Sequence, residues 1–191
     1  MGDIYGEIIK KAEPYLNTRK NDVHVPLAYD FARRLLKHYP EADEDVVLPA
    51  IILHDVGWKM VPEEKQLECF GLKTDINKRR IHEREGVIIA HEILASLGYA
   101  NEKIREILDI VDGHDTRQEA LNLNDQLVKD ADKLWRFTAV GVEIDYKRFG
   151  RTLGEQLEFL ARVIDEWLFT AEAKDMAREA LDSANKETGS E

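Results

Sequence analysis

The chain has 191 residues, of which 43% are hydrophobic and 34% charged, a composition typical of a globular rather than a disordered protein. With 27 Lys and Arg against 38 Asp and Glu, the net charge of −11 disfavours non-specific binding to a nucleic-acid polymer. No apolar run approaches the roughly 20 residues of a membrane helix, and the N-terminus lacks the layout of a signal peptide. These features predict one domain over residues 1–191, in the cytoplasm, with neither a membrane nor nucleic acid as partner.

Apolar residues recur at helical spacing along most of the chain. The pattern predicts helices over 21–38, 43–54, 78–97, 104–113, 127–135 and 153–167, and an Ala- and Glu-rich helix from 171 to about 187. Asp43 is expected to be an N-cap and Gly98 to end the helix before it. Period-two alternation and Asn-Gly or Asp-Gly turns, the usual signs of strands and hairpins, are lacking. The predicted fold class is therefore all-α.

Two segments, 58–77 and 113–126, interrupt this helical pattern. Each follows a helix that ends at or near a His-Asp pair, and loops in such places often contact substrates. A role as plain connectors stays equally open. The single cysteine, Cys69, lies in the first segment; it excludes an internal disulfide and is interpreted as a bystander rather than a nucleophile.

Several catalytic classes lack their motifs. None of the three serines lies in a Gly-x-Ser-x-Gly turn, and the sequence contains neither a P-loop nor GxGxxG. Neither His82 nor His91 is followed four residues later by a second histidine, so no HExxH zinc motif is present. His38 and His91 are interpreted as structural.

The dipeptide His-Asp occurs at His54-Asp55 and again at His114-Asp115. In LPAIILHDVGW the first pair ends a continuous apolar run, which predicts an imidazole and a carboxylate at the buried end of a core helix. Such burial is costly unless both groups are paired or bind a metal ion. Gly57 allows the backbone to turn away directly afterwards. The alternative is an ordinary helix end, where His54 caps carbonyls and Asp55 starts a turn.

The segment VKDADKLWRF supplies further carboxylates. Asp132 shares a helix face with Val128 and Trp135, so it is the better candidate for an inward carboxylate, with Asp130 in solvent or capping a helix. Lys133 beside it is suited to meet a phosphate. An exposed acidic helix face is the alternative. His24 follows the inward stripe of the first predicted helix, where a lone histidine is usually a satisfied core residue.

The order of His24, His54-Asp55 and Asp132 resembles the HD-domain superfamily of metal-dependent phosphohydrolases. The resemblance covers about residues 20–140 and includes the segments RIHEREGVIIAHEILASLG and IVDGHD. It implies a compact bundle of the HD type, with additional helices over about 150–187 outside the matched region. It also implies His24, His54, Asp55 and Asp132 as metal ligands, with Asp130 as the lesser candidate. The Gly-Tyr-Pro motif of the diguanylate-phosphodiesterase branch is lacking.

This ligand set suits one divalent transition metal. Two imidazoles and two carboxylates fit Mn²⁺, Fe²⁺, Co²⁺, Ni²⁺ or Zn²⁺; Mg²⁺ is also admitted, and a second ion is left open. Asp55 is the candidate to accept a proton from a metal-activated water, with His82 and Lys133 as further catalytic candidates. The candidates for binding substrate phosphate are Lys59, Lys78, Arg79, His82, His114 and Lys133. Structural roles are the alternative for His82 and His114.

Together these features predict a metal-dependent phosphohydrolase, either a monoesterase or a diesterase, that acts on a small phosphorylated molecule such as a nucleotide. A regulatory module that binds a metal or a nucleotide without catalysis is the main alternative. A metal-dependent oxygenase or lyase on the same scaffold is a third hypothesis. A homodimer is left open, because Trp167 and Phe169 could pack either on the core or on a second copy.

Overall fold

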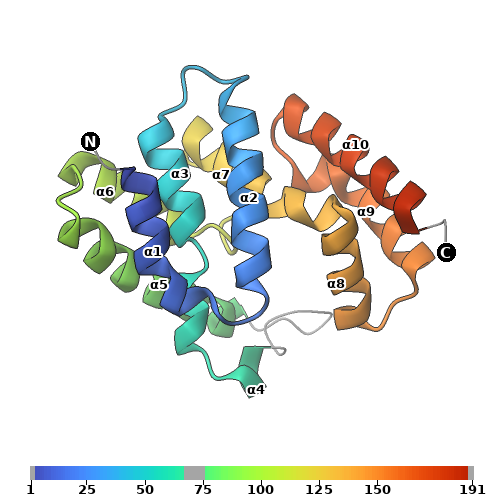
Figure 1. Ribbon diagram of the computed structural model, residues 1–191, viewed down its shortest axis with the longest axis horizontal. Coiled ribbons are helices and arrows are strands. Elements are labelled where there is room, and N and C mark those ends of the chain that lie inside the picture. The colour runs from blue at the N-terminus through green and yellow to red at the C-terminus, as the bar shows by residue number, and fades with distance from the viewer. Residues whose placement is uncertain (1–2, 67–75, 189–191) are drawn as a thin grey trace.

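The computed structural model describes residues 3–66 and 76–188, apart from the side chains of 65, 76, 78 and 188. Within these residues the structure contains α-helices and short 3₁₀-helices but no strand, which confirms the all-α prediction (Figure 1). The elements in chain order are α1 Ile4–Leu16, α2 Asn21–Leu36, α3 Glu44–Leu53, η1 Val56–Met60, α4 Glu63–Gln66, α5 Ile76–Ser96, α6 Asn101–Val111, α7 Leu123–Leu134, η3 Trp135–Phe137, α8 Ala139–Phe149, α9 Leu153–Trp167 and α10 Ala171–Thr188. None of the described helices combines the length and apolarity needed to cross a membrane. Cys69 lies outside the described residues.

Helix α3 is the centre of the bundle. Asp43 is its N-cap, as predicted, and its carboxylate accepts a hydrogen bond from the backbone N–H of Asp45 at 2.9 Å. Every residue from 46 to 53 is buried, and α2, α6 and α7 pack against the helix. A helix covered on all sides ends in the protein interior, so the residues that follow Leu53 begin inside the molecule.

The chain turns sharply after α3 because Gly57 has no side chain. A Cβ atom on Gly57 would lie 1.9 Å from the backbone oxygen of His82 and 2.4 Å from the backbone nitrogen of Gly86. This close approach packs η1 directly against α5. It also places the ring of Trp58 in parallel contact with that of His82, with centroids 3.9 Å apart.

The C-terminal helices α8, α9 and α10 gather on one side of α2, away from α1, α5 and α6 (Figure 1). Asp130 on α7 holds the start of α10 by accepting hydrogen bonds from Phe169 N at 2.7 Å, Thr170 N at 3.0 Å and Thr170 Oγ1 at 2.7 Å. One buried apolar cluster extends from Ile8 on α1 to Ala184 on α10. These helices therefore share a core with those that carry the candidate site.

Most predicted helices are present with ends shifted by a few residues, and Gly98 follows α5 with a φ of 66°, as its predicted role requires. The pattern missed α1, α8 and the short α4. Helix α1 contains Pro14, which the structure tolerates within the helix. In α8 the buried residues are Gly141, Val142 and Asp145, too few and too polar to form a recognisable apolar stripe.

The close approach at Gly57 predicts a large stability difference between two glycine substitutions. Gly57→Ala is expected to lower the free energy of unfolding by about 3 kcal/mol or more, because backbone atoms of α5 would have to move. Gly154→Ala on α9 is the matched control: a Cβ there meets nothing within 4 Å, so stability should stay equal or rise by up to about 1 kcal/mol. Urea denaturation followed by circular dichroism measures both. Equal stability of the two variants would contradict this packing.

Candidate functional site

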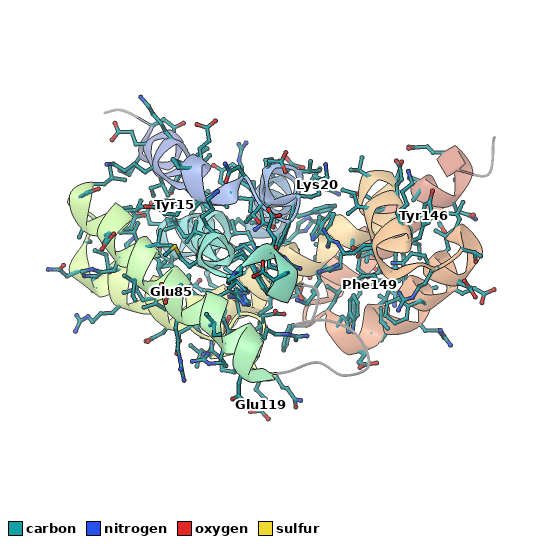
Figure 2. The ribbon with its side chains drawn as sticks, turned by 90° about the horizontal axis from the view of Figure 1, so that it is seen from below. Tyr15, Lys20, Glu85, Glu119, Tyr146 and Phe149 are labelled. Carbon is teal, nitrogen blue, oxygen red and sulfur yellow. The ribbon has the colours of Figure 1, made fainter. Side chains whose placement is uncertain are left out.

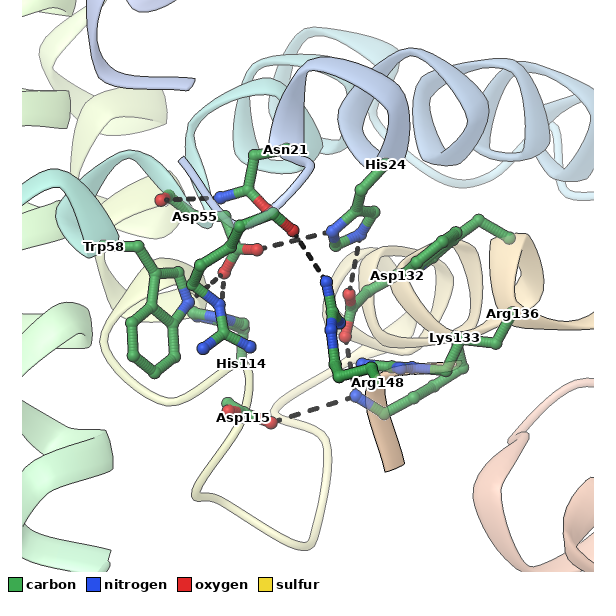
Figure 3. A pocket seen from close by; sticks show the side chains of 12 residues that line it. Asn21, His24, Asp55, Trp58, His114, Asp115, Asp132, Lys133, Arg136 and Arg148 are labelled. Carbon is green, nitrogen blue, oxygen red and sulfur yellow. Dashed lines mark hydrogen bonds and ion pairs between the residues drawn. The ribbon is translucent and has the colours of Figure 1, made fainter. Parts of the chain in front are cut away.

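The structure brings together His24, His54, Asp55 and Asp132. They come from α2, from the end of α3 and from α7, and all four are buried (Figure 3). His24 lies between the two carboxylates, with Nδ1 at 3.4 Å from Asp55 Oδ2 and Nε2 at 3.1 Å from Asp132 Oδ1. Nε2 of His54 is 3.6 Å from Asp55 Oδ2 and 3.4 Å from Asp132 Oδ1. Ligand-type atoms from three separate segments therefore converge on one point.

The imidazoles are oriented as a cation site requires. His54 Nδ1 is 2.8 Å from the carbonyl oxygen of Ile51 and donates its proton there, so Nε2 is the ring nitrogen that faces the carboxylates. Nε2 of His24 and Nε2 of His54 are buried and make no hydrogen bond within the described part of the chain. Buried polar atoms of this kind are costly unless they are compensated. The donor set of His24, His54 and Asp132 therefore fits a metal ion, and so does that of His54, Asp55 and His114.

The electrostatics of the cluster also favour a cation. Burial lowers the pKa of His54, but the carboxylates of Asp55 and Asp132 outweigh it and raise this pKa to about 9. Burial raises the pKa of Asp55, but His54, His114 and His24 hold it well below its usual range. Burial acts in the same way on Asp132, whose pKa is held low by Lys133 and the histidines. The two carboxylates are thus ionised, and their charge has to be balanced from within the site.

His82 and His114 lie next to this cluster. Their Nε2 atoms are 3.3 Å apart, and His114 Nε2 is 3.4 Å from Asp55 Oδ1. His114 Nδ1 is 2.9 Å from the carbonyl oxygen of Val111, which leaves Nε2 directed into the site, as in His54. Burial and the neighbouring His114 lower the pKa of His82 to about 4, so His82 is neutral.

The loop that carries His114 is held by a buried lysine on one side. Lys129 on α7 is 4% exposed, and its Nζ donates hydrogen bonds to three backbone carbonyls of this loop. The bonds to Gly113, His114 and Arg117 measure 2.9, 2.9 and 2.8 Å. Lys129 therefore fixes the backbone at the position from which His114 projects.

A buried glutamate holds the same loop from the other side. Glu83 on α5 accepts hydrogen bonds from the backbone N–H groups of Asp115 at 3.0 Å and Thr116 at 2.9 Å, and from Thr116 Oγ1 at 2.7 Å. It also pairs with Arg80 at 2.6 Å. Carbonyls of the loop thus bind a lysine and its amides bind a carboxylate, which restrains His114 and Asp115 from two directions.

The cluster opens into a pocket in which the empty space, including the open solvent at its mouth, is about 380 Å³. Most of the lining residues are charged, and they come from the turn before α2, the end of α3, the loop after α6, and from α7, η3 and α8. The lining residues are Arg19, Asn21, His24, Asp55, Trp58, His114, Asp115, Asp132, Lys133, Trp135, Arg136 and Arg148. Ionised carboxylates and cations thus share the lining of one pocket (Figure 3).

Of the predicted substrate contacts, Lys133 and His114 line this pocket. Lys133 Nζ is 2.6 Å from Asp132 Oδ2 and 4.0 Å from Asp115 Oδ1. Lys59 does not line it, because its side chain is exposed and bonds to Asn17 at 2.7 Å.

Three further predicted contacts lie elsewhere. Arg79 is outside the pocket lining and contacts Asp115 at 3.5 Å from behind. His82 is fully buried against Trp58, so it does not reach the pocket either. The side chain of Lys78 is outside the described residues.

Sequence reasoning missed Asp115 and the cations Arg19, Arg136 and Arg148. Asp115 belongs to the second His-Asp pair, and Arg136 follows the KLW segment, so proximity to recognised motifs could have indicated these two. Arg19 lies in the turn before α2 and Arg148 on α8, and no motif marks either position. Figure 2 labels Lys20 and Phe149, which are the neighbours of Arg19 and Arg148 in the sequence. The turn before α2 contacts the end of α8 there, because Arg148 Nη2 donates a hydrogen bond to the carbonyl oxygen of Arg19 at 2.9 Å.

Comparison with known proteins identifies the bundle. A family model described as HD domain matches residues 22–136. The crystal structure of a predicted HD superfamily hydrolase from an uncultured Thermotogales bacterium is similar, with a TM-score of 0.62 and 17% sequence identity. The match covers 96% of this chain and 88% of that one. No curated protein matches the chain in sequence.

Because Glu83 holds the loop after α6, we predict that amide hydrogen exchange in this loop depends on Glu83. Glu83→Ala removes the acceptor of two backbone N–H groups, so amide hydrogen exchange at Asp115 and Thr116 should become about 10- to 100-fold faster. Glu92→Ala, at an exposed position of the same helix, is the control and should leave these amides unchanged. Hydrogen exchange followed by NMR measures this. Unaltered protection in Glu83→Ala would show that other contacts hold the loop.

Proposed function

The chain belongs to the HD-domain family, and from this membership and the geometry of its buried cluster we propose that it is a metal-dependent phosphohydrolase of a small phosphorylated molecule. Nucleotides are the first class to test. The observation that carries the proposal is the pair of buried, unbonded Nε2 atoms of His24 and His54, which face two ionised carboxylates at the base of a cation-lined pocket. Family membership alone supports a metal-dependent hydrolase type of function.

His24, His54, Asp55 and Asp132 are the proposed ligands of one divalent ion. When bound, such an ion lowers the pKa of a water molecule to about 7 and offsets the negative charge of a phosphoryl group. Lys133 lies between Asp132 and Asp115 and faces the pocket, so its ammonium group is placed to bind a phosphoryl oxygen.

Asp115 is a better candidate than Asp55 to accept the proton of an attacking water. Asp55 Oδ1 already accepts a hydrogen bond from Trp58 Nε1 at 2.9 Å, and Asp55 Oδ2 faces His24 and His54. The Asp115 carboxylate lines the pocket. Burial raises the pKa of Asp115, but Lys133, His114 and Arg79 lower it below its usual value, so the carboxylate is ionised and able to accept a proton.

Two neighbouring aspartates give a sharp test of the ligand assignment. Asp132→Asn is expected to weaken Mn²⁺ binding by about 100-fold or more, because it removes a charged ligand from a buried site. Asp130→Asn should bind Mn²⁺ as the parent protein does and lose about 1–3 kcal/mol of stability, since Asp130 holds the start of α10. Isothermal titration calorimetry and thermal unfolding measure the two effects. Equal loss of metal in both variants would contradict the assignment.

Catalysis is tested by release of phosphate from a panel of nucleotides and sugar phosphates with Mn²⁺. Asp55→Ala is expected to lower kcat by about 1000-fold or more, because metal-assisted stabilisation is worth several kcal/mol. Asp30→Ala, an exposed aspartate on α2, is the control and should keep full activity. Metal binding without any turnover across the panel would instead favour a regulatory metal-binding module.

A further inference from the structure

Two arginines line the pocket on the side away from Trp58. In Figure 3, Trp58 lies on one side of the pocket, whereas Arg136 on η3 and Arg148 on α8 lie on the other. Arg19 belongs to the Trp58 side, because its guanidinium carbon is 4.0 Å from the centre of the Trp58 ring and its Nη1 donates to the carbonyl oxygen of Gln66 at 3.3 Å. The side chains of Arg136 and Arg148 are 17% and 18% exposed. Both are therefore mostly buried and still part of the pocket lining.

One buried carboxylate holds both of these arginines. Asp145 on α8 is 2% exposed, and its Oδ2 is 2.6 Å from Arg136 Nη1. Its Oδ1 is 3.5 Å from Arg148 Nη1, and Arg148 Nη2 donates a hydrogen bond to the carbonyl oxygen of Arg19 at 2.9 Å. Asp145 itself is not a lining residue. A carboxylate in this place restricts the rotamers of the arginines, which lowers the entropy that they lose when they bind an anion.

Both guanidinium groups keep donors that the protein does not use. Each guanidinium has five N–H groups. Within the described residues, Arg136 donates hydrogen bonds from Nη1 alone, and Arg148 from Nη1 and Nη2. None of their nitrogens that make no bond is fully buried. These arginines are therefore able to donate to an anion in the pocket while they remain paired with Asp145.

The charge of a bound phosphoryl group has to be balanced by arginines. We call the part of the pocket lined by Asp55, Asp115, Asp132 and Lys133 the metal side. Its three carboxylates carry three negative charges, and the lysine together with one divalent ion would supply three positive ones. The metal side is then neutral before a substrate enters. The negative charge that a phosphoryl group adds is therefore left to the arginines of the lining.

Arg136 and Arg148 are within electrostatic reach of the metal side and of each other. Burial lowers the pKa of Arg136, but Asp145 and then Asp132 raise it above its usual value. Burial lowers the pKa of Arg148, Asp145 opposes this, and the nearby Arg136 adds to it. The charge of Asp55 also acts on Arg148. An anion that contacts both guanidinium groups would relieve the repulsion between them.

We propose that Arg136 and Arg148 bind the phosphoryl group of the substrate together with Lys133, and that Asp145 is the positioning residue for both arginines. This inference rests on the proposed function and adds binding residues to it. Asp145 and Arg148 lie outside residues 22–136. Helix α8 thus completes the phosphoryl site from beyond the part of the chain that the family model matches.

The first test measures binding of orthophosphate to Mn²⁺-loaded protein by isothermal titration calorimetry. The parent protein is expected to bind it with a Kd below about 1 mM. Arg148→Gln should weaken this binding by about 10-fold or more, because it removes a charged donor. Its affinity for Mn²⁺ should stay within about 3-fold of the parent, since no hydrogen bond of Arg148 reaches a proposed ligand. Arg162→Gln, at an exposed position of α9, removes the same charge and should match the parent in both titrations.

The second test separates positioning from simple attraction by charge. Asp145→Asn makes the surroundings of the pocket more positive, so attraction by charge alone would tighten orthophosphate binding. Loss of the ion pairs that hold the two arginines should instead weaken it by about 3- to 10-fold. Glu143→Gln, at an exposed position of the same helix, changes the charge equally and should leave orthophosphate affinity as in the parent.

Any of four results would overturn the inference. Without detectable orthophosphate binding to the parent, there is no phosphoryl site of this kind. Unchanged affinity in Arg148→Gln would leave Arg148 with a purely structural role. Equal losses in Arg148→Gln and Arg162→Gln would indicate general attraction by charge. Equal or tighter binding in Asp145→Asn would remove the positioning role.

Thermal unfolding checks the fold of each variant. If Asp145→Asn does not fold, Arg148→Lys takes its place, because a lysine keeps the charge but loses the fork that reaches both Asp145 and the carbonyl oxygen of Arg19. Arg148→Lys should bind orthophosphate at least about 3-fold more weakly than the parent. An affinity equal to that of the parent would again remove the positioning role.

Turnover distinguishes a failure of this inference from a failure of the proposed function. With Mn²⁺ and any substrate that the panel finds, Arg148→Gln should lower kcat/KM by about 10- to 100-fold. If no substrate is hydrolysed while orthophosphate binding still depends on Arg148, the proposed function fails and the anion site stands. If hydrolysis occurs and neither kcat/KM nor orthophosphate affinity depends on Arg148, the proposed function stands and this inference fails.

Discussion

The C-terminal end of helix α3 is the constraint from which the rest of the site follows. The last carbonyls of a helix lack partners within it, and here they lie in the protein interior without access to water. His54 satisfies the carbonyl of Ile51 through Nδ1, and the same bond turns Nε2 towards the carboxylates. His114 does the same with Val111 at the end of α6. One hydrogen bond thus both caps the helix and orients Nε2. The sequence left open whether His54 caps the helix or is a candidate metal ligand, and this bond is consistent with both.

The charged residues near the end of α3 fall into two groups, those that line the pocket and those that hold the loop after α6. Those that line the pocket pair with other side chains, as Lys133 does with Asp132, whereas Lys129 and Glu83 are buried in contact with backbone groups. Each of these two satisfies several backbone groups of the loop after α6, which otherwise contains little regular structure. A loop that is fixed in this way can project His114 and Asp115 with the precision usually provided by a helix.

The sequence was informative wherever a polar residue interrupted an apolar pattern. His24, His54 and Asp132 interrupt apolar faces of helices, which marked them as candidates to face inward, and the resemblance to the HD-domain superfamily implied that they meet. The strong apolar period predicted the helical fold class. Arg148 does not interrupt an apolar pattern. It lies on α8, which has too few buried apolar residues for the sequence to predict the helix itself. Its place in the pocket depends on how α8 packs near the turn at Arg19, a long-range contact that no local pattern records.

The positions of Arg19 and Arg148 have a consequence for how such a protein can change. Both lie outside residues 22–136, the region that matches the family model, whereas the proposed ligands all lie within it. Arg19 and Arg148 thus lie in stretches of chain separate from those that carry the proposed ligands, and they join them at one pocket. Replacements in the turn before α2 or in α8 can therefore change the lining of the pocket while the four proposed ligands stay as they are.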